Sequence, residues 1–189
     1  MEFFFDLGSP YSYLASTQLP ALAERTGATI RWRPMALFAV FAGTGNRMPA
    51  ETPAKARWML DDLGRWSRHY GVPFRFTTRF PVNALQAMRL VLVGDRYGRG
   101  EAVATEAFRR IWVDDLDVTT PDGLLDLARA VDLDPAEIGD PAIKDALKAN
   151  GEEAVRRGVF GAPAMFVGDA LFFGNDRLHF VEQALRDAR

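Results

Sequence analysis

The 189-residue chain is expected to form an α/β protein with a β-α-β unit first, a helical block next and a ββα unit last. Two observations predict this order. Short apolar runs typical of strands occur near the two ends, and the middle has no convincing period-two alternation. The order is that of a thioredoxin-like fold split by an all-helical insertion. We expect residues 1–36 and 158–189 to form the thioredoxin-like domain and residues 37–157 to form the insertion.

The first unit is defined by an aromatic run followed by a helix start signal. Ser9 suits an N-cap, and Pro10 suits the first helical position, where its missing N–H is not needed. Pro20 is expected to kink the helix that follows. The unit should contain a buried strand over Glu2–Asp6, a helix over Tyr11–Arg25 and a strand over Ala28–Arg33.

The remaining elements follow from apolar periodicity and from Pro, Gly and Asp boundaries. Helices are expected over 52–70, 83–97, 101–112, 121–131 and 141–157. Two strands, over 164–167 and 170–173, should pair as a hairpin. Asp176 is expected to N-cap a last helix that runs to about Ala188, with Leu178, Val181 and Leu185 on its core face.

Composition excludes several classes of function. The chain has no cysteine, which excludes disulfides, a CxxC redox pair, a Cys nucleophile and thiolate metal sites. The two histidines, His69 and His179, are interpreted as surface residues, so no metal is expected. With a formal net charge of -2 and no basic block, no nucleic-acid partner is expected. No apolar run is long enough for a membrane span and no signal pattern opens the chain, so we expect a cytoplasmic location.

Ser9 is the leading candidate for chemistry. It lies where a strand meets a helix N-terminus, and the free N–H groups and helix dipole there favour negative charge. In a redox thioredoxin relative the reactive thiolate lies at this point. The hydroxyl of Ser9 can instead donate a hydrogen bond to an anion that a ligand brings. The alternative interpretation is a plain N-cap, which spacing alone favours.

A second feature is Gly161-Ala162-Pro163, where a proline opens a strand. A cis Ala162–Pro163 bond would turn the backbone of Ala162 outward, where an extended peptide could pair with it. The alternative is an ordinary strand-entry proline, which base rates favour.

Other candidates are weaker on the residues alone. Asn175 and Asp176 could recognise a ligand's ammonium group or simply cap a helix, Lys55 is typical of a solvated helix start, and Asn46 lies in a polar stretch. Aromatic side chains could line a ligand site, but most are interpreted as core. These are Trp32, Trp58, Trp66 and Phe80. The pairs Asp61-Asp62 and Asp114-Asp115 are interpreted as surface charge, because adjacent residues point apart.

Several motifs occur in one order over essentially the whole chain. They are Asp6-Leu7-Gly8-Ser9-Pro10-Tyr11-Ser12-Tyr13, Arg33-Pro34, Gly45-Asn46, Lys55-Ala56-Arg57, Pro81-Val82-Asn83, Ala87-Met88-Arg89, Gly158-Val159-Phe160-Gly161-Ala162-Pro163 and Phe172-Phe173-Gly174-Asn175-Asp176-Arg177-Leu178. Together they resemble the 2-hydroxychromene-2-carboxylate isomerases and the kappa-class glutathione transferases. The two end motifs are specific only in combination.

The resemblance implies glutathione as cofactor and a homodimer. It implies that Ser9 hydrogen-bonds the glutathione sulfur and that Ala162, before a cis Pro163, pairs with the cysteinyl part. Asp176 with Asn175 would hold the γ-glutamyl ammonium. Further positions implied to contact ligand or substrate are Asn46, Lys55, Arg33, Pro34 and Asn83.

Three functions agree with this sequence. The first is a glutathione-dependent isomerase that interconverts 2-hydroxychromene-2-carboxylate and trans-o-hydroxybenzylidenepyruvate in aromatic-compound catabolism. The second is a kappa-class-like glutathione transferase that acts on another electrophile. The third is a thioredoxin-fold binding module without catalysis.

Overall fold

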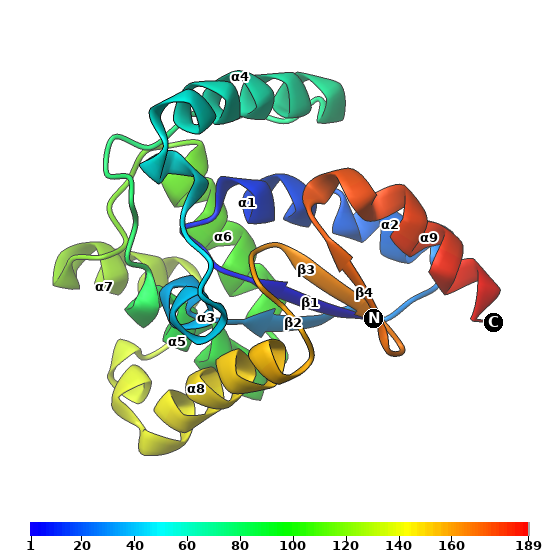
Figure 1. The fold of residues 1–189 in the computed structure, drawn as a ribbon. Coiled ribbons are helices and arrows are strands. Elements are labelled where there is room, and N and C mark those ends of the chain that lie inside the picture. The colour runs from blue at the N-terminus through cyan, green and yellow to red at the C-terminus, as the bar shows by residue number, and fades with distance from the viewer. Residues whose placement is uncertain (189) are drawn as a thin grey trace.

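The computed structural model describes residues 1–188 and has a four-stranded sheet at its centre (Figure 1). The strands lie in the order β2-β1-β3-β4. β1 pairs parallel with β2 and antiparallel with β3, and β3 and β4 form an antiparallel hairpin. This topology confirms the predicted thioredoxin-like fold. The strands are β1 (Glu2–Phe5), β2 (Arg31–Pro34), β3 (Ala164–Val167) and β4 (Ala170–Phe173).

The central strand β1 is buried on both faces. Phe3 and Phe5 belong to one core cluster and Phe4 to the other, as alternating side chains of a strand require. All three rings are fully buried. The aromatic run at the start of the chain therefore joins two layers of the core.

Helices cover both faces of the sheet. α1 (Pro10–Ser16), α2 (Leu19–Thr26) and α9 (Leu178–Asp187) lie on one side, and α8 (Pro141–Arg156) lies on the other (Figure 1). The single kinked helix predicted over 11–25 is wrong. Because Pro20 cannot donate an N–H and its ring would collide with the preceding turn, the chain forms two helices there.

The segment between β2 and β3 is helical throughout its regular structure. Its four predicted helices before α8 are present with shifts of at most two residues at an end, whereas α3 was not predicted. The elements are α3 (Leu37–Thr44), η1 (Pro49–Glu51), α4 (Pro53–Tyr70), α5 (Leu85–Arg96), α6 (Gly100–Trp112), α7 (Pro121–Ala130) and η2 (Pro135–Gly139).

The last helix of this segment packs on the sheet itself. Ala154 of α8 shares a buried cluster with Phe4 of β1. The contacts of the sheet layer therefore extend into the predicted insertion, and the boundary at residue 157 stays a prediction. Among residues 1–188, no helix has both the length and the apolarity needed to cross a membrane.

Candidate active site

The turn between β1 and α1 is held by local hydrogen bonds. The Ser9 amide donates to the Asp6 carbonyl over 3.0 Å, and the Gly8 amide donates to Asp6 Oδ1 over 2.7 Å. The Ser12 amide donates to Ser9 Oγ over 3.2 Å, which confirms Ser9 as the N-cap of α1. Ser9 is buried, and its hydroxyl lies at the N-terminus of α1.

The helical segment packs directly on this turn. Nε1 of the buried Trp112 donates to the Leu7 carbonyl over 2.9 Å. On the other side a Cβ at Gly8 would lie 2.5 Å from the Val82 carbonyl oxygen, closer than real Cβ contacts. The turn thus depends on a glycine at position 8 and on contacts from both α6 and the segment before α5.

The turn faces the loop that precedes β3. Ser9 Oγ donates to the Ala162 carbonyl oxygen over 3.3 Å, a long bond. The Ala162–Pro163 peptide bond is cis, as the resemblance implied. The structure therefore brings together two residues that were singled out separately in the sequence.

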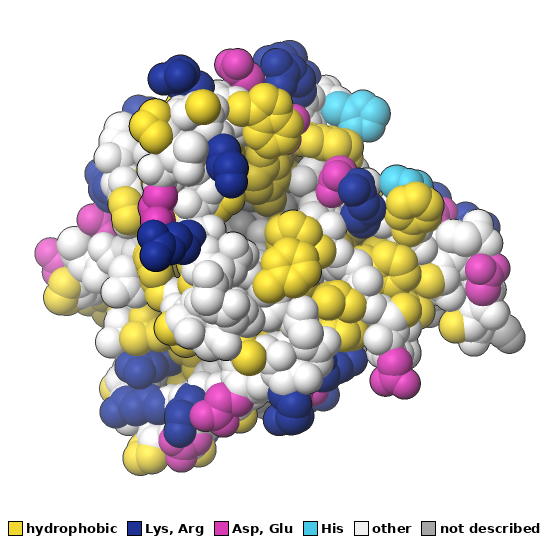
Figure 2. All heavy atoms as spheres, viewed as in Figure 1, with side chains coloured by type: hydrophobic (Ala, Val, Ile, Leu, Met, Phe, Trp, Pro, Cys, Tyr) yellow, Lys and Arg dark blue, Asp and Glu magenta, His cyan; other side chains and the backbone are white. Residues whose placement is uncertain are grey.

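A cavity of about 480 Å³ opens beside Ser9. Its volume lies within the ordinary range for small-molecule sites. Figure 2 shows hydrophobic side chains around a hollow on the face below α4. Five predicted residues line it: Ser9, Asn46, Ala162, Asn175 and Asp176. Among residues 1–188, no group of three or more His, Cys, Asp or Glu side chains could hold a metal ion.

Arg33 and Pro34 do not line this cavity. The Arg33 guanidinium is buried and donates to Asn150 Oδ1 over 2.8 Å and to carboxylates of Glu2 and Glu153 over 2.5 Å each. Pro34 is buried at the end of β2. The expected substrate contact is replaced by an ion-pair network that joins β1, β2 and α8.

Lys55, Asn83 and Pro163 also lie outside the lining. Lys55 is exposed in the first turn of α4. Asn83 is exposed and its Oδ1 accepts from the Leu85 amide over 3.4 Å at the start of α5. Asn46, by contrast, lines the cavity, and its Nδ2 donates to the Phe160 carbonyl over 2.7 Å.

Aromatic side chains from several elements line the cavity. The interpretation as core is confirmed for Trp32 and is wrong for Trp58, which is exposed. Trp66 and Phe80 pack against the core and also line the cavity. Trp58, Asp62, Trp66 and Tyr70 are spaced four residues apart, so they share one face of α4. This spacing was the signal in the sequence that would have identified a wall.

Asp62 is a cavity residue and not plain surface charge. The Tyr11 hydroxyl donates to Asp62 Oδ2 over 3.0 Å, and both side chains line the cavity. Burial raises the pKa of Tyr11 above its ordinary value, and the negative charges of Asp62 and Asp176 raise it further. Tyr11 therefore stays protonated and can only act as a hydrogen-bond donor or acceptor.

The turn before α9 supplies the opposite wall. The predicted N-cap role of Asp176 is wrong, because a 3-10 turn η3 (Asn175–Arg177) precedes α9, and the Asp176 carboxylate pairs with Arg177. Asn175 is buried, and its carbonyl accepts from the Tyr70 hydroxyl over 2.8 Å. The Asp176 carboxylate lines the cavity and has Arg177 as its ion-pair partner.

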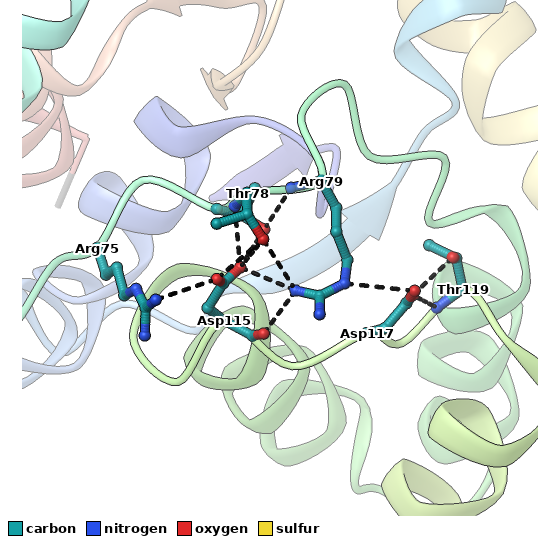
Figure 3. Close-up of polar contacts among 7 residues, drawn as sticks. Arg75, Thr78, Arg79, Asp115, Asp117 and Thr119 are labelled. Atoms are coloured by element: carbon teal, nitrogen blue, oxygen red, sulfur yellow. Dashed lines mark hydrogen bonds and ion pairs between the residues drawn. The ribbon is translucent and has the colours of Figure 1, made fainter.

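A polar cluster around Asp115 holds the segment that leads to Phe80 (Figure 3). Asp115 accepts from the Thr77 hydroxyl over 2.8 Å, from the Thr78 amide over 3.0 Å and from Arg79 over 2.9 Å. The Thr78 and Thr77 hydrogen bonds lower the pKa of Asp115 to about 2. The interpretation of Asp115 as surface charge is therefore wrong. It is the centre of a loop anchor.

Asp6 is the buried acid of the site and was not among the predicted site residues. Both its oxygens accept backbone amides, from Gly8 and from Leu37, over 2.7 Å each. Burial raises its pKa to about 6, although the two amides favour the charged form. Its position directly after an apolar strand was the available signal.

Comparisons with known proteins agree with the fold and the motifs. Residues 1–186 match the model of the DSBA-like thioredoxin domain. A 2-hydroxychromene-2-carboxylate isomerase of Sphingobium xenophagum is 38% identical over 99% of this chain and 98% of its own length. Glutathione S-transferase kappa 1 of Homo sapiens is 28% identical over 98% of this chain and 90% of its own length.

A solved structure of a 2-hydroxychromene-2-carboxylate isomerase superposes with a TM-score of 0.85 at 27% identity, covering 99% of this chain and 94% of the other. Fold, chain length and sequence thus agree with the same group of enzymes. The chain therefore belongs to the DSBA-like thioredoxin domain family and, within it, to the family of 2-hydroxychromene-2-carboxylate isomerases, which makes it an isomerase.

Proposed function

We propose that this protein is a glutathione-dependent isomerase that interconverts 2-hydroxychromene-2-carboxylate and trans-o-hydroxybenzylidenepyruvate. The observation that carries the proposal is the buried hydroxyl of Ser9, at a helix N-terminus and open to an aromatic-walled cavity. The chain itself has no thiol. The relatives named as isomerases and as a kappa-class glutathione transferase support the reaction and the external thiol.

The donors and acceptors of the cavity suit glutathione. The Asp176 carboxylate can hold an ammonium group, the Ser9 hydroxyl can donate to a sulfur, and the backbone of Ala162 can pair with an extended peptide. Bound glutathione would supply a thiolate that adds reversibly to the unsaturated ring-opened substrate, so that a former double bond can rotate before the thiolate leaves. Asn46 would hold the edge of the cavity through its bond to the Phe160 carbonyl. Lys55 would contact the ligand from a position outside the cavity lining.

Ser9 would stabilise the anion that a thiol becomes on ionisation. An ordinary thiol has a pKa of about 8.5, so little is ionised at neutral pH. The long bond from Ser9 Oγ to the Ala162 carbonyl can be exchanged for a bond to sulfur at small cost. The dipole of α1 adds favourable potential at the same point.

The aromatic walls would orient the substrate. Phe38, Phe41, Trp58, Trp66 and Phe80 present apolar surfaces around the cavity. Flat rings pack well against such surfaces, and a fixed orientation lowers the entropic part of the barrier.

The test is conversion of 2-hydroxychromene-2-carboxylate followed by ultraviolet absorbance, with glutathione and with S-methylglutathione. We expect conversion with glutathione only, and full recovery of free thiol afterwards. Absence of conversion by folded protein at any glutathione concentration would contradict the proposal. Thiol that is consumed in step with an electrophile would favour the transferase instead.

A further inference from the structure

The Asp6 carboxylate joins two walls of the cavity. Its Oδ1 accepts the Gly8 amide, in the turn that carries Ser9, and its Oδ2 accepts the Leu37 amide, at the start of α3. Both distances are 2.7 Å, which is typical of charge-assisted bonds. Asp6 is buried and lines the cavity, so each oxygen is committed to one wall.

α3 has no cap from its own N-terminal residues. Its N-cap position is Ala36, which has no side-chain hydrogen bond to offer. The Asp6 carboxylate satisfies the first amide of α3 from another element and places negative charge at the helix N-terminus, where it is favourable. α3 in turn carries Phe38 and Phe41, two aromatic walls of the cavity.

We propose that Asp6 is a positioning residue whose ionised carboxylate fixes the distance between the Ser9 turn and the α3 wall, and thereby sets the affinity of the cavity for its aromatic substrate. The activity readout of this proposal rests on the proposed function. The two hydrogen bonds of Asp6 do not depend on the proposed function, because both amides and both oxygens belong to the chain itself.

Protonation would release this link. A neutral carboxyl group carries an O–H, and that oxygen no longer accepts an amide well. Burial brings the pKa of Asp6 to about 6, close to neutral pH. The other titratable side chains of the lining are Tyr11, Asp62 and Asp176, from α1, α4 and η3. The residues that line the cavity beside Asp6 have no titratable side chain, so Asp6 is the titrating group between these walls. They are Leu37, Phe38, Phe41, Asn46, Met48, Pro49, Phe80, Pro81 and Val82.

The test compares Asp6→Asn with wild type in steady-state kinetics between about pH 5 and pH 8. The Asn side chain has one acceptor oxygen, so its NH₂ group would face either the Gly8 or the Leu37 amide, and that amide would lose its acceptor. We expect the KM for the chromene substrate at neutral pH to rise about tenfold, the scale of one charged hydrogen bond, with a smaller change in kcat. In wild type the KM should rise as the pH falls below about 6, whereas in Asp6→Asn it should stay flat.

Asp134→Asn is the matched control. Asp134 caps η2 with Oδ1 on the Ala136 amide over 2.9 Å, and it does not line the cavity. Its KM should equal that of wild type. A folded Asp6→Asn protein with wild-type KM and wild-type pH dependence would overturn the proposal.

Amide hydrogen exchange gives a readout without substrate. The Leu37 amide should exchange about tenfold faster in Asp6→Asn than in wild type. In wild type the exchange rate of the Leu37 amide, divided by its intrinsic rate at each pH, should increase as the pH falls through about 6. This measurement tests the proposal even if the variant does not fold. Unchanged Leu37 exchange would overturn the proposal. If isomerisation itself is absent, the exchange experiment still decides on Asp6, so the two failures are distinguishable.

Discussion

The Tyr70 hydroxyl donates to the Asn175 carbonyl over 2.8 Å, which ties the end of α4 to the turn that carries Asp176. The Asn175 side chain returns a longer contact, from Nδ2 to the same hydroxyl over 3.4 Å. This link joins the helical segment to the C-terminal hairpin unit across the cavity. The Tyr70 hydroxyl therefore helps to hold the turn that carries Asp176 against α4.

Tyr70→Phe should weaken glutathione binding. The change keeps the ring and removes the hydroxyl, so it leaves the Asn175 carbonyl without this donor at a cost of about 1 kcal/mol. We expect a severalfold rise in the Kd for glutathione by calorimetry. Tyr97→Phe is the control, because Tyr97 is exposed and its hydroxyl reaches only Glu137. Equal effects of both changes would show that the link is not specific.

Ser9→Ala should lower turnover by roughly one to three orders of magnitude, the scale of losing one donor to a developing anion. Thr120→Ala is the matched control, since Thr120 also caps a helix, α7, through its hydroxyl on the Gly123 amide. Each change should lower the free energy of unfolding by about 1 kcal/mol, but only Ser9→Ala should affect the rate. An unchanged rate in folded Ser9→Ala would refute its catalytic role.

Gly8→Ala should destabilise the protein and abolish activity. The new Cβ would lie 2.5 Å from the Val82 carbonyl oxygen, and a backbone atom cannot move aside without shifting the turn or the segment before α5. Gly151→Ala in α8 is the opposite case, because nothing lies within 4 Å of its added Cβ. That change should stabilise the protein by about 0.4–1 kcal/mol in urea unfolding. Equal stabilities of the two variants would contradict this account.

The stability of the protein should have a pH dependence that belongs to Asp6. Because its pKa rises to about 6 in the folded state, the folded protein holds a proton that the unfolded chain has lost between about pH 4 and pH 6. The free energy of unfolding should therefore gain up to roughly 3 kcal/mol as the pH falls through this window. In Asp6→Asn this gain should vanish. Parallel urea-unfolding curves of the two proteins across the window would contradict the assignment.

Asp115→Asn should loosen the Phe80 wall. The variant keeps the left-handed backbone that Asp115 adopts, at φ 54°, but weakens the bonds to Thr77, Thr78 and Arg79. We expect a higher KM for the aromatic substrate with little change in glutathione affinity. Asp132→Asn is the control, since Asp132 has φ 53° and only an exposed ion pair with Arg99. An unchanged KM in Asp115→Asn would show that the Asp115 cluster does not position the Phe80 wall of the cavity.

Short-range signals predicted most elements of the fold. The hairpin strands β3 and β4 have the expected bounds, because apolar runs and a Gly-Asp turn are local properties. α3 was missed for a physical reason. Its N-terminal amide is capped by Asp6, which lies in another element far earlier in the chain, so no local start signal exists.

Site residues could be predicted where the local sequence alone marks their position in the backbone. Ser9 at a helix start and Ala162 before a proline could be identified from the sequence, and the structure brings them together. Arg33 could not be placed, because a motif does not reveal that Glu2, Glu153 and Asn150 surround it. Asp62 was misassigned for the same reason, since its partner Tyr11 comes from a distant helix.

The position of β1 in the middle of the sheet has a consequence for biosynthesis. β1 leaves the ribosome before β2, β3 and β4, and its antiparallel partner β3 is made only after the whole helical segment. At about 5–20 residues per second, the nascent chain waits many seconds with the Phe3-Phe4-Phe5 run paired at most with β2. Such an exposed aromatic strand is prone to aggregate. Yield of native protein should therefore depend on chaperones that shield nascent chains and on the speed of translation.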